Sequence, residues 1–459
     1  MGLKMTMGMS LTQQLAKFTA TTDFDDLPDD VIAATERRVL DTMGVAWAGS
    51  TAPGCEAACQ TILDEQAAGV STLWASGEMT SSRGAAFVNG MHAAALDFDT
   101  VYERGSVPPD IVPVPAAWAI AEQTGASGQA FLTAVALGNE IACRLGAANL
   151  HNKGWFYTAA HGVFGAAAAA AKLLDLDAEG ISNALGLALS RAGGSQQALV
   201  EKSLAKRAQS GFAAEAGVFA AQLAARCFSG PREAIEGKFG YFALYGEGDA
   251  EVLIQGLGRD FEQMSTAIKK YPSCTANHVP IDLLIGLAVE NNLEAADVDE
   301  VGIQLSPFAY GLVGGAFDPS ANPQVAAQFS IQYSAASAIM RRRLGIADIQ
   351  DNAVLDPDIA QFIAKVSVDI DDANSGKFAP ATVRVRTSDG EILERSLEHV
   401  PGTPSNPLTD AEVAAKFRDC AAFGLKPLSD VDADTLAATL GGVSGRENLG
   451  GIFTRVHDQ

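Results

Sequence analysis

The sequence predicts a mostly α-helical protein with two domains, a large all-helical domain and a smaller α+β domain inserted into it. A chain of 459 residues is too long for one ordinary domain, and its 48% hydrophobic content is enough for two large cores. In the first two-thirds of the chain, apolar residues recur at helical spacing. From about residue 270 to residue 400, β-branched residues alternate with polar ones instead.

Helices are predicted where apolar residues keep the helical period between glycine or proline breaks. They cover residues 31–48, 113–122, 128–145, 162–174, 177–192 and 209–227. Alanine and glycine are abundant, whereas aromatic residues make up 7% of the chain. Small side chains at contact positions let helix axes approach closely, so this part of the chain is expected to pack around one core.

Strands are predicted at residues 301–305, 366–371 and 382–387, followed by a turn into a strand at 391–393. We expect a small antiparallel sheet with helices between its strands. After a loop, Thr409-Asp410-Ala411-Glu412 fits a capping box that opens another helix. The predicted domains are residues 1–268, an inserted domain at 269–400, and a return to the first domain at 401–459.

The formal net charge of −23 argues against nucleic acid or an anionic membrane as the partner. It also makes local cations informative, because a site for an anionic substrate must gather lysines or arginines against the overall field. The six cysteines are scattered and lack the paired spacing of a zinc site. No secretory signal is visible, so we expect reduced thiols and a cytoplasmic location.

The sequence contains no phosphate loop, dinucleotide fingerprint or nucleophile elbow. Four local segments remain as candidates for the functional site. The segments are Asn89 to Asp99; Gly154 to Thr158 with Gly162 to Ala167; Arg207 to Gly211 with Phe228 to Pro231 and Glu236 to Gly240; and Lys269 to Cys274 with His278. In order and spacing they resemble the conserved blocks of the MmgE/PrpD family. This family contains 2-methylcitrate dehydratase, cis-aconitate decarboxylase and iminodisuccinate epimerase.

The resemblance implies a lid-like α+β domain, a homodimer and a small polycarboxylate as the substrate, with no metal or organic cofactor. Members of the family move a proton at a carbon beside a carboxylate. Such a proton is weakly acidic, so a base must lie within hydrogen-bond reach of it. Fixed cations or donors must also stabilise the charge that develops.

Three histidines expected from the dehydratases and decarboxylases are missing here. Residues 98–110 contain no histidine, Phe156-Tyr157 stands where those relatives tend to have His-Pro, and Cys274 replaces a histidine of the decarboxylase. Water elimination and decarboxylation both need a proton donor. Epimerisation instead needs two groups on opposite faces of a planar intermediate, which Tyr157 and a lysine can supply. The pattern therefore resembles iminodisuccinate epimerase more than the other two.

Functional roles are carried onto the positions that match the family blocks. Lys202 and Lys206 compete for one family lysine, because the Lys-x-x-His-x-Gly pattern is degenerate here. Each candidate also has a structural interpretation: Asp97 can order a helix end, Tyr157 can bond a core carbonyl, and Cys274 can be a buried free thiol. The predicted catalytic residues are Asp97, Tyr157, Lys206 and Lys269, and the predicted substrate-binding residues are Lys202, Tyr102, Arg104, Cys274 and His278.

Three functions follow from this reading. The first is a cofactor-independent epimerase that moves an α-proton on iminodisuccinate or a similar polycarboxylate. The second is a 2-methylcitrate-type dehydratase, a hydro-lyase in which Tyr157 or Cys274 replaces histidine. The third is a non-catalytic helical dimer that binds carboxylates. The sequence leaves the natural substrate and its stereochemistry open.

Overall fold

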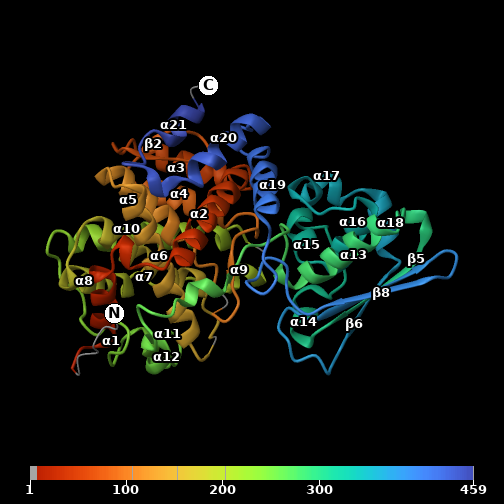
Figure 1. The fold of residues 1–459 in the computed structure, drawn as a ribbon, viewed down its shortest axis with the longest axis horizontal. Coiled ribbons are helices and arrows are strands. Elements are labelled where there is room, and N and C mark those ends of the chain that lie inside the picture. The colour runs from red at the N-terminus through yellow and green to blue at the C-terminus, as the bar shows by residue number, and fades with distance from the viewer. Residues whose placement is uncertain (1–7, 106, 152, 202, 458–459) are drawn as a thin grey trace. The chain divides into compact units, whose positions relative to one another are not determined.

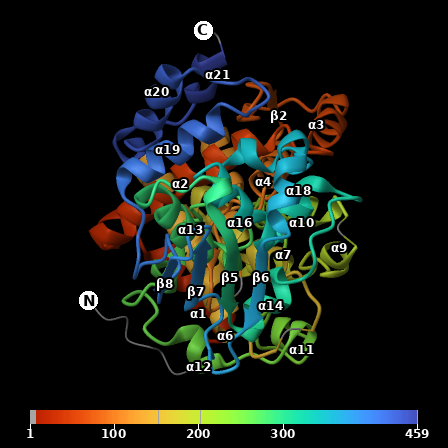
Figure 2. The same ribbon diagram turned by 90° about the vertical axis from the view of Figure 1, so that its right-hand side faces the viewer.

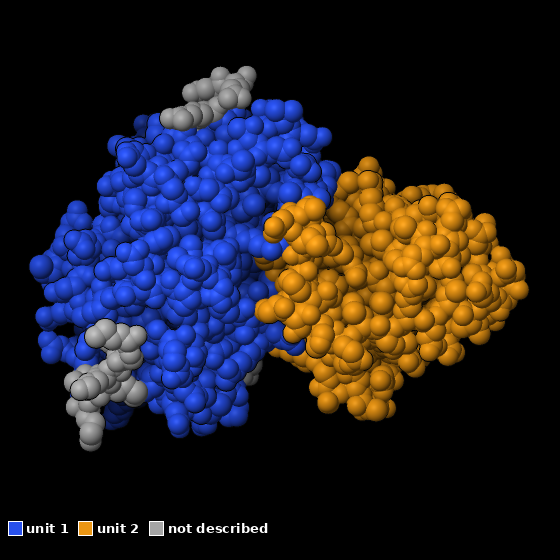
Figure 3. Space-filling model, in the orientation of Figure 1, with its two compact units in different colours: residues 1–267, 413–459 blue, residues 268–412 orange. Residues whose placement is uncertain are grey.

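The chain folds into two compact units, described here by a computed structural model of residues 8–105, 107–151, 153–201 and 203–457 (Figure 1). Unit 1 comprises Met1–Ala267 and Val413–Gln459, and unit 2 comprises Ile268–Glu412 (Figure 3). Helices dominate the described residues, which confirms the prediction of a mostly α-helical protein. No helix among these residues is both long enough and apolar enough to span a membrane.

Unit 1 consists mainly of helices from both of its chain segments. Its longer helices are α1 (Leu11–Thr21), α2 (Asp29–Gly49), α3 (Cys55–Asp64), α4 (Ser82–Ala93), α5 (Pro113–Thr124), α6 (Gly128–Ala148), α7 (Tyr157–Leu173), α8 (Ala178–Leu189), α10 (Ala205–Ala224), α19 (Asp410–Ala421) and α20 (Asp430–Leu440), of which α19 begins in unit 2. The short helices are α9 (Gln197–Val200), α11 (Tyr241–Tyr245), α12 (Ala250–Ile254) and α21 (Ile452–His457).

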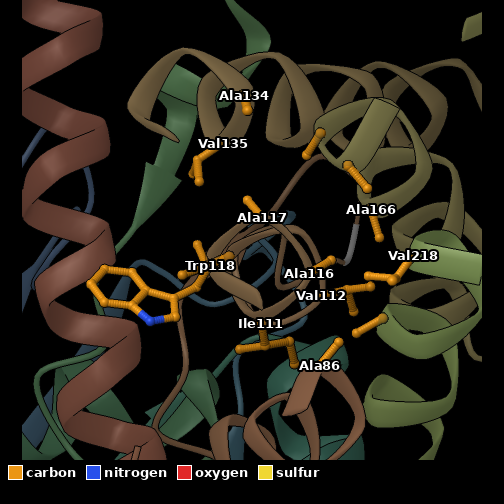
Figure 4. Packing of buried hydrophobic residues seen from close by; sticks show 14 of the residues in the cluster. Ala86, Ile111, Val112, Ala116, Ala117, Trp118, Ala134, Val135, Ala166 and Val218 are labelled. Carbon is orange, nitrogen blue, oxygen red and sulfur yellow. The ribbon is translucent and has the colours of Figure 1, made fainter. Parts of the chain in front are cut away.

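The core of unit 1 lies between α5, α6, α7 and α10, where Ala116, Ala166 and Val218 are among the fully buried residues (Figure 4). These helices touch backbone to backbone. A Cβ added at Gly138 of α6 would lie 2.6 Å from the Gly165 carbonyl oxygen of α7. This contact confirms the predicted close approach of alanine- and glycine-rich helices. Larger side chains at such positions would force the helix axes apart.

Two helices begin four or five residues earlier than the sequence predicts. Helix α7 begins at Tyr157 rather than at residue 162, because the amides of Ala159 and Ala160 already bond to the Phe156 carbonyl. Helix α10 begins at Ala205 rather than at residue 209. Both differences bring predicted site residues, Tyr157 and Lys206, onto the first turn of a helix.

Unit 1 is not all-helical, contrary to the prediction. Strand β1 (Ser71–Thr72) pairs with β2 (Met79–Thr80), and β3 (Val101–Tyr102) pairs with β4 (Thr266–Ala267), both antiparallel. Two-residue strands are too short to show a period of two in the sequence, which explains why they were not predicted. The second pair joins the segment after Asp99 to the end of the first part of unit 1.

Unit 2 is an α+β unit built on one four-stranded sheet. Its strands are β5 (Val298–Leu305), β6 (Val366–Ile370), β7 (Ala381–Thr387) and β8 (Ile392–Leu397), and its helices are α13 (His278–Glu290), α14 (Pro307–Val313), α15 (Pro323–Gln328), α16 (Ile331–Met340), α17 (Asp351–Val354) and α18 (Pro357–Ile363). The sheet order is β6-β5-β7-β8, seen face on in Figure 2.

The sheet of unit 2 is mixed, whereas the sequence predicted a purely antiparallel one. Strand β5 pairs parallel with β6 and antiparallel with β7. The parallel pair is possible because α14 to α18 lie between β5 and β6 in the chain and give the long crossover that parallel strands need. Alternate residues of β5 and β7, such as Ile303 and Val383, are fully buried in the core of this unit.

The predicted capping box at residues 409–412 is confirmed. The Thr409 amide donates to Glu412 Oε2 at 2.8 Å, and the Glu412 amide donates to Thr409 Oγ1 at 3.2 Å. The loop around Gly402, which precedes the capping box, belongs to unit 2 rather than to the returning segment predicted from residue 401. The Ile268 amide donates to the Gly402 carbonyl at 3.0 Å. The two ends of unit 2 are thus tied within the unit itself.

Candidate active site

Asp97 and Lys206 form an ion pair, with Lys206 Nζ 2.9 Å from Asp97 Oδ1. Asp97 lies shortly after α4, and Lys206 lies on the first turn of α10. The two helices pack so closely that a Cβ at Gly90 would lie 3.3 Å from the Gly211 Cα. Two sequence blocks far apart in the chain therefore meet through the packing of α4 on α10.

The geometry of this pair suits proton transfer. The side chains of Asp97 and Lys206 are 17% and 25% exposed, so a small ligand can reach both of them. Asp97 has a φ of 54°, a left-handed conformation that aspartate tolerates better than most residues but that still costs energy. A carboxylate accepts a proton and an ammonium donates one, so the pair combines both functions.

Arg207, the neighbour of Lys206, fixes the beginning of α10. Its Nη1 donates to the Pro53 carbonyl at 2.8 Å, and its side chain also hydrogen-bonds to Cys55. Burial lowers the pKa of the Arg207 guanidinium and raises the pKa of the Cys55 thiol to about 11. The thiol therefore stays protonated at neutral pH and has a packing role.

Buried polar groups hold the segment that follows Asp97. The Phe98 carbonyl accepts a hydrogen bond from Lys416 Nζ. Asp110, fully buried, accepts from Thr100 Oγ1 at 2.6 Å and lies 3.4 Å from Arg38 Nε. Arg38 and Asp110 are both removed from water, so loss of either one would leave the other as an uncompensated buried charge.

Tyr102 and Arg104, predicted to bind substrate, are both bonded to Glu262. Tyr102 Oη donates to Glu262 Oε2 at 2.6 Å, and Arg104 Nη1 lies 2.9 Å from Glu262 Oε1. Tyr102 is fully buried, and burial raises the pKa of its hydroxyl well above the usual range. The Arg104 side chain is 55% exposed, so it remains accessible to an anion.

Tyr157, predicted to be catalytic, bonds to backbone carbonyls. Its hydroxyl lies 2.7 Å from the His151 oxygen and 2.8 Å from the Tyr245 oxygen, so its single proton is shared between two acceptors. The ring stacks on His161 with 4.9 Å between centroids. His161 is fully buried, and burial lowers its pKa to about 3, so the imidazole is neutral at physiological pH.

The predicted residues of unit 2 lie in a segment held by hydrogen bonds of its own. Lys269 and Cys274 are buried, and the Cys274 amide donates to the Gln328 carbonyl at 2.9 Å. His278 is fully buried, with Nε2 3.3 Å from the Ser273 carbonyl oxygen. This places His278 against the backbone of the segment that carries Lys269 and Cys274.

Lys202, the rival of Lys206 for the family lysine, lies outside the described residues. Within the described parts of the chain, no group of three or more His, Cys, Asp or Glu side chains is arranged to hold a metal ion.

Sequence reasoning missed Lys416 and Asp41, which form a buried ion pair of 2.7 Å. Neither residue belongs to a motif. The available signal was a charge on an apolar helix face: Lys416 follows Val413 at helical spacing, and Asp41 stands between Val39 and Met43.

Comparison with known proteins assigns the chain to a family. A family model described as the MmgE/PrpD N-terminal domain matches residues 13–253, and one described as the MmgE/PrpD C-terminal domain matches residues 271–435. The chain belongs to the MmgE/PrpD family. The resemblance inferred from the four sequence blocks is thereby confirmed.

Curated relatives in the MmgE/PrpD family are named as decarboxylases. Cis-aconitate decarboxylase from Aspergillus terreus is 24% identical over 438 residues, covering 90% of this chain and 89% of that protein. Cis-aconitate decarboxylase from Homo sapiens is 26% identical over 427 residues, covering 89% and 87%. These names describe lyases, so they do not support the predicted closeness to iminodisuccinate epimerase. They favour the lyase alternative instead.

Proposed function

We propose that this MmgE/PrpD protein is a lyase acting on a small tricarboxylic acid, with Lys206 and Asp97 as its proton-transfer pair. The single observation that carries the proposal is the 2.9 Å contact between Lys206 Nζ and Asp97 Oδ1, which joins two family blocks in a partly exposed position. The substrate class is taken from the relatives, because cis-aconitate is a tricarboxylate, as is 2-methylcitrate.

Water elimination assigns one role to each member of the pair. The Asp97 carboxylate takes the proton from the carbon beside a carboxylate, and the electrons of that C–H bond form the new double bond. The C–O bond breaks, and the Lys206 ammonium protonates the leaving hydroxyl to give water. Transfer of the proton from Asp97 to the Lys206 amine then restores the pair.

Decarboxylation uses the same ammonium differently. When the C–C bond to the departing carboxylate breaks, its electron pair stays on carbon and CO₂ leaves. The Lys206 ammonium then protonates that carbon, and Lys206 regains a proton from solvent. Asp97 keeps the ammonium oriented throughout. The two lyase reactions therefore need the same residues, and the substrate decides between them.

An epimerase of the iminodisuccinate type is the second candidate. The observation that favours it is the absence of three histidines at positions 98–110, 156–157 and 274. An epimerase needs a second proton-transfer group on the opposite face of the substrate, for which Tyr157 is the predicted residue. It needs no donor to a leaving group.

Product analysis in deuterated water tests the proposal. The full-length protein would be incubated with cis-aconitate, citrate, 2-methylcitrate and iminodisuccinate, and each mixture followed by proton NMR. A lyase gives a new olefinic product or a decarboxylated acid from one of the tricarboxylates. Loss of the α-proton signal of iminodisuccinate without a new product indicates the epimerase. Protection of Lys206 from acylation by a tricarboxylate without turnover indicates a carboxylate-binding protein and overturns the lyase.

We further propose that the protein acts in the cytoplasm as a homodimer and needs no cofactor. None of the six cysteines forms a disulfide in the described residues, which fits a reducing compartment. Light scattering of the purified protein measures its mass in solution, and activity after exhaustive dialysis against a chelator tests the requirement for metal.

A further inference from the structure

Lys416, on α19 of the C-terminal segment, makes three contacts with one buried ammonium. Its Nζ lies 2.7 Å from Asp41 Oδ1 of α2, donates to the Phe98 carbonyl at 2.9 Å, and lies 3.9 Å from the centroid of the Phe98 ring. The side chains of Lys416 and Asp41 are 5% and 1% exposed. The ammonium thus joins α19 and α2 to the residue that directly follows Asp97.

A buried ammonium is kept in a protein only when its contacts offset the loss of water. Here the Asp41 carboxylate, the Phe98 carbonyl and the face of the Phe98 ring together offset that loss. All three constrain the position of Lys416, and the bond to the Phe98 carbonyl fixes the peptide plane between Phe98 and Asp99. Since Asp97 sits in a left-handed conformation at φ 54°, the direction of its side chain depends on how firmly the next residue is held.

We infer that Lys416 is a positioning residue for the Asp97–Lys206 pair. It holds the Phe98 carbonyl, and through it the left-handed turn that directs the Asp97 carboxylate toward Lys206. This inference rests on the proposed function for its effect on turnover. It rests on geometry alone for its effect on the ion pair.

Other charges surround the Lys416–Asp41 contact. Burial raises the pKa of Asp41 to about 6, although Lys416 opposes the shift, and the carboxylates of Asp110 and Asp99 add to it. Arg38 lies beside Asp110. Protonation of Asp41 below about pH 6 removes one of the three partners of Lys416 and weakens the hold on Phe98. Lys416 should therefore position Asp97 less firmly below about pH 6 than at neutral pH.

The first test is the chemical reactivity of Lys206, which requires no substrate. Limited acylation followed by peptide mass spectrometry would compare wild type with Lys416→Met, Lys416→Arg, Asp97→Asn and Lys172→Met. Lys172 is the matched control, because its Nζ also bonds a carboxylate, of Asp23, and a carbonyl, of Ala20. We expect both Lys416→Met and Asp97→Asn to raise the acylation rate of Lys206 several-fold, and Lys416→Arg and Lys172→Met to leave it near wild type.

Stability is controlled with the double variant Asp41→Asn/Lys416→Met. Removing both charges leaves neither one buried and alone, so this variant folds even where Lys416→Met does not. It still lacks the bond to Phe98, so Lys206 is again acylated faster. An unchanged acylation rate of Lys206 in a folded Lys416 variant overturns the inference.

Turnover gives the second test. A misdirected carboxylate should lower kcat by about 100-fold, with KM changed far less, because small displacements of reacting groups cost this much. Lys416→Arg should restore part of kcat. If Lys206 becomes more reactive in Lys416→Met but the wild type converts no tricarboxylate, the proposed function fails and the positioning role stands. If turnover exists and Lys416→Met leaves kcat unchanged, the positioning role fails.

Discussion

Lys206 Nζ, on α10, donates a hydrogen bond of 2.9 Å to Asp97 Oδ1. Asp97 follows α4 and has a left-handed backbone conformation. The contact depends on two features of the fold: the close packing of α4 on α10, and the hydrogen bond that holds the Phe98 carbonyl. It places Lys206, one of the two lysines that match the family position, beside the predicted acid. It is therefore the first target for substitution.

Lys206→Met and Asp97→Asn should each abolish most of the activity, because removal of a general acid or base costs about 10²- to 10⁴-fold in rate. Steady-state rates with the tricarboxylate that is turned over would measure the loss. Lys172→Met, which removes another lysine of an ion pair with Asp23, should retain wild-type rates. If Lys202→Met lost more activity than Lys206→Met, the choice of Lys206 would be wrong.

Tyr157→Phe separates the lyase from the epimerase. In the lyase, the hydroxyl only bonds the carbonyls of His151 and Tyr245, so its loss should destabilise the protein by about 1 kcal/mol and leave kcat within a few-fold. In the epimerase, Tyr157 is the second proton-transfer group, and its loss should stop solvent exchange of the α-proton. Thermal melts and deuterium exchange, run on the same preparation, measure both effects.

His161→Phe should flatten the acid side of the stability profile. The folded-state pKa of His161 is lowered to about 3, below the ordinary value of about 6.5, so the unfolded chain binds more protons between these values. The stability that the neutral ring contributes is fully present above about pH 6.5 and falls as the pH is lowered. Between neutral pH and pH 5, His161 should lower the free energy of unfolding by about 2 kcal/mol, and His161→Phe should abolish this loss.

Melting temperatures at pH 5 and pH 7.5 measure this difference. Phenylalanine keeps the stack on Tyr157, so the variant should be at least as stable as wild type at pH 7.5. His151→Phe, at an exposed position, is the control and should keep the wild-type profile. An unchanged acid profile in His161→Phe would show that the imidazole is solvated in the folded protein.

Lys269→Met should weaken substrate binding more than it slows the reaction. The motif match predicts Lys269 as a cation at the site, either catalytic or bound to a substrate carboxylate; the residue is 7% exposed, and we expect the binding role. Loss of one charge-assisted hydrogen bond should raise KM by about 10-fold or more. Lys270→Met is the control, because Lys270 bonds Asp282 and Glu412 within unit 2. A larger effect on kcat than on KM would move Lys269 into the proton-transfer chemistry.

The amino-acid sequence by itself determined the features that depend on neighbours along the chain. Apolar residues at helical spacing predicted α2 and α6 to within a few residues, and the exchange of bonds between Thr409 and Glu412 followed from their separation of three. The order of the four motif blocks gave the family. These properties are local or sequential, so they can be read without knowing the fold.

The tertiary structure decided everything that depends on distant segments. The parallel pairing of β5 with β6 follows a long crossover, and the β3–β4 pair joins Val101 to Ala267. The packing of α4 on α10 brings Lys206 next to Asp97. Lys416 reaches Phe98 from 318 residues away along the chain. No periodicity encodes such a contact, because a buried charge reveals its partner only when the helices around it have packed.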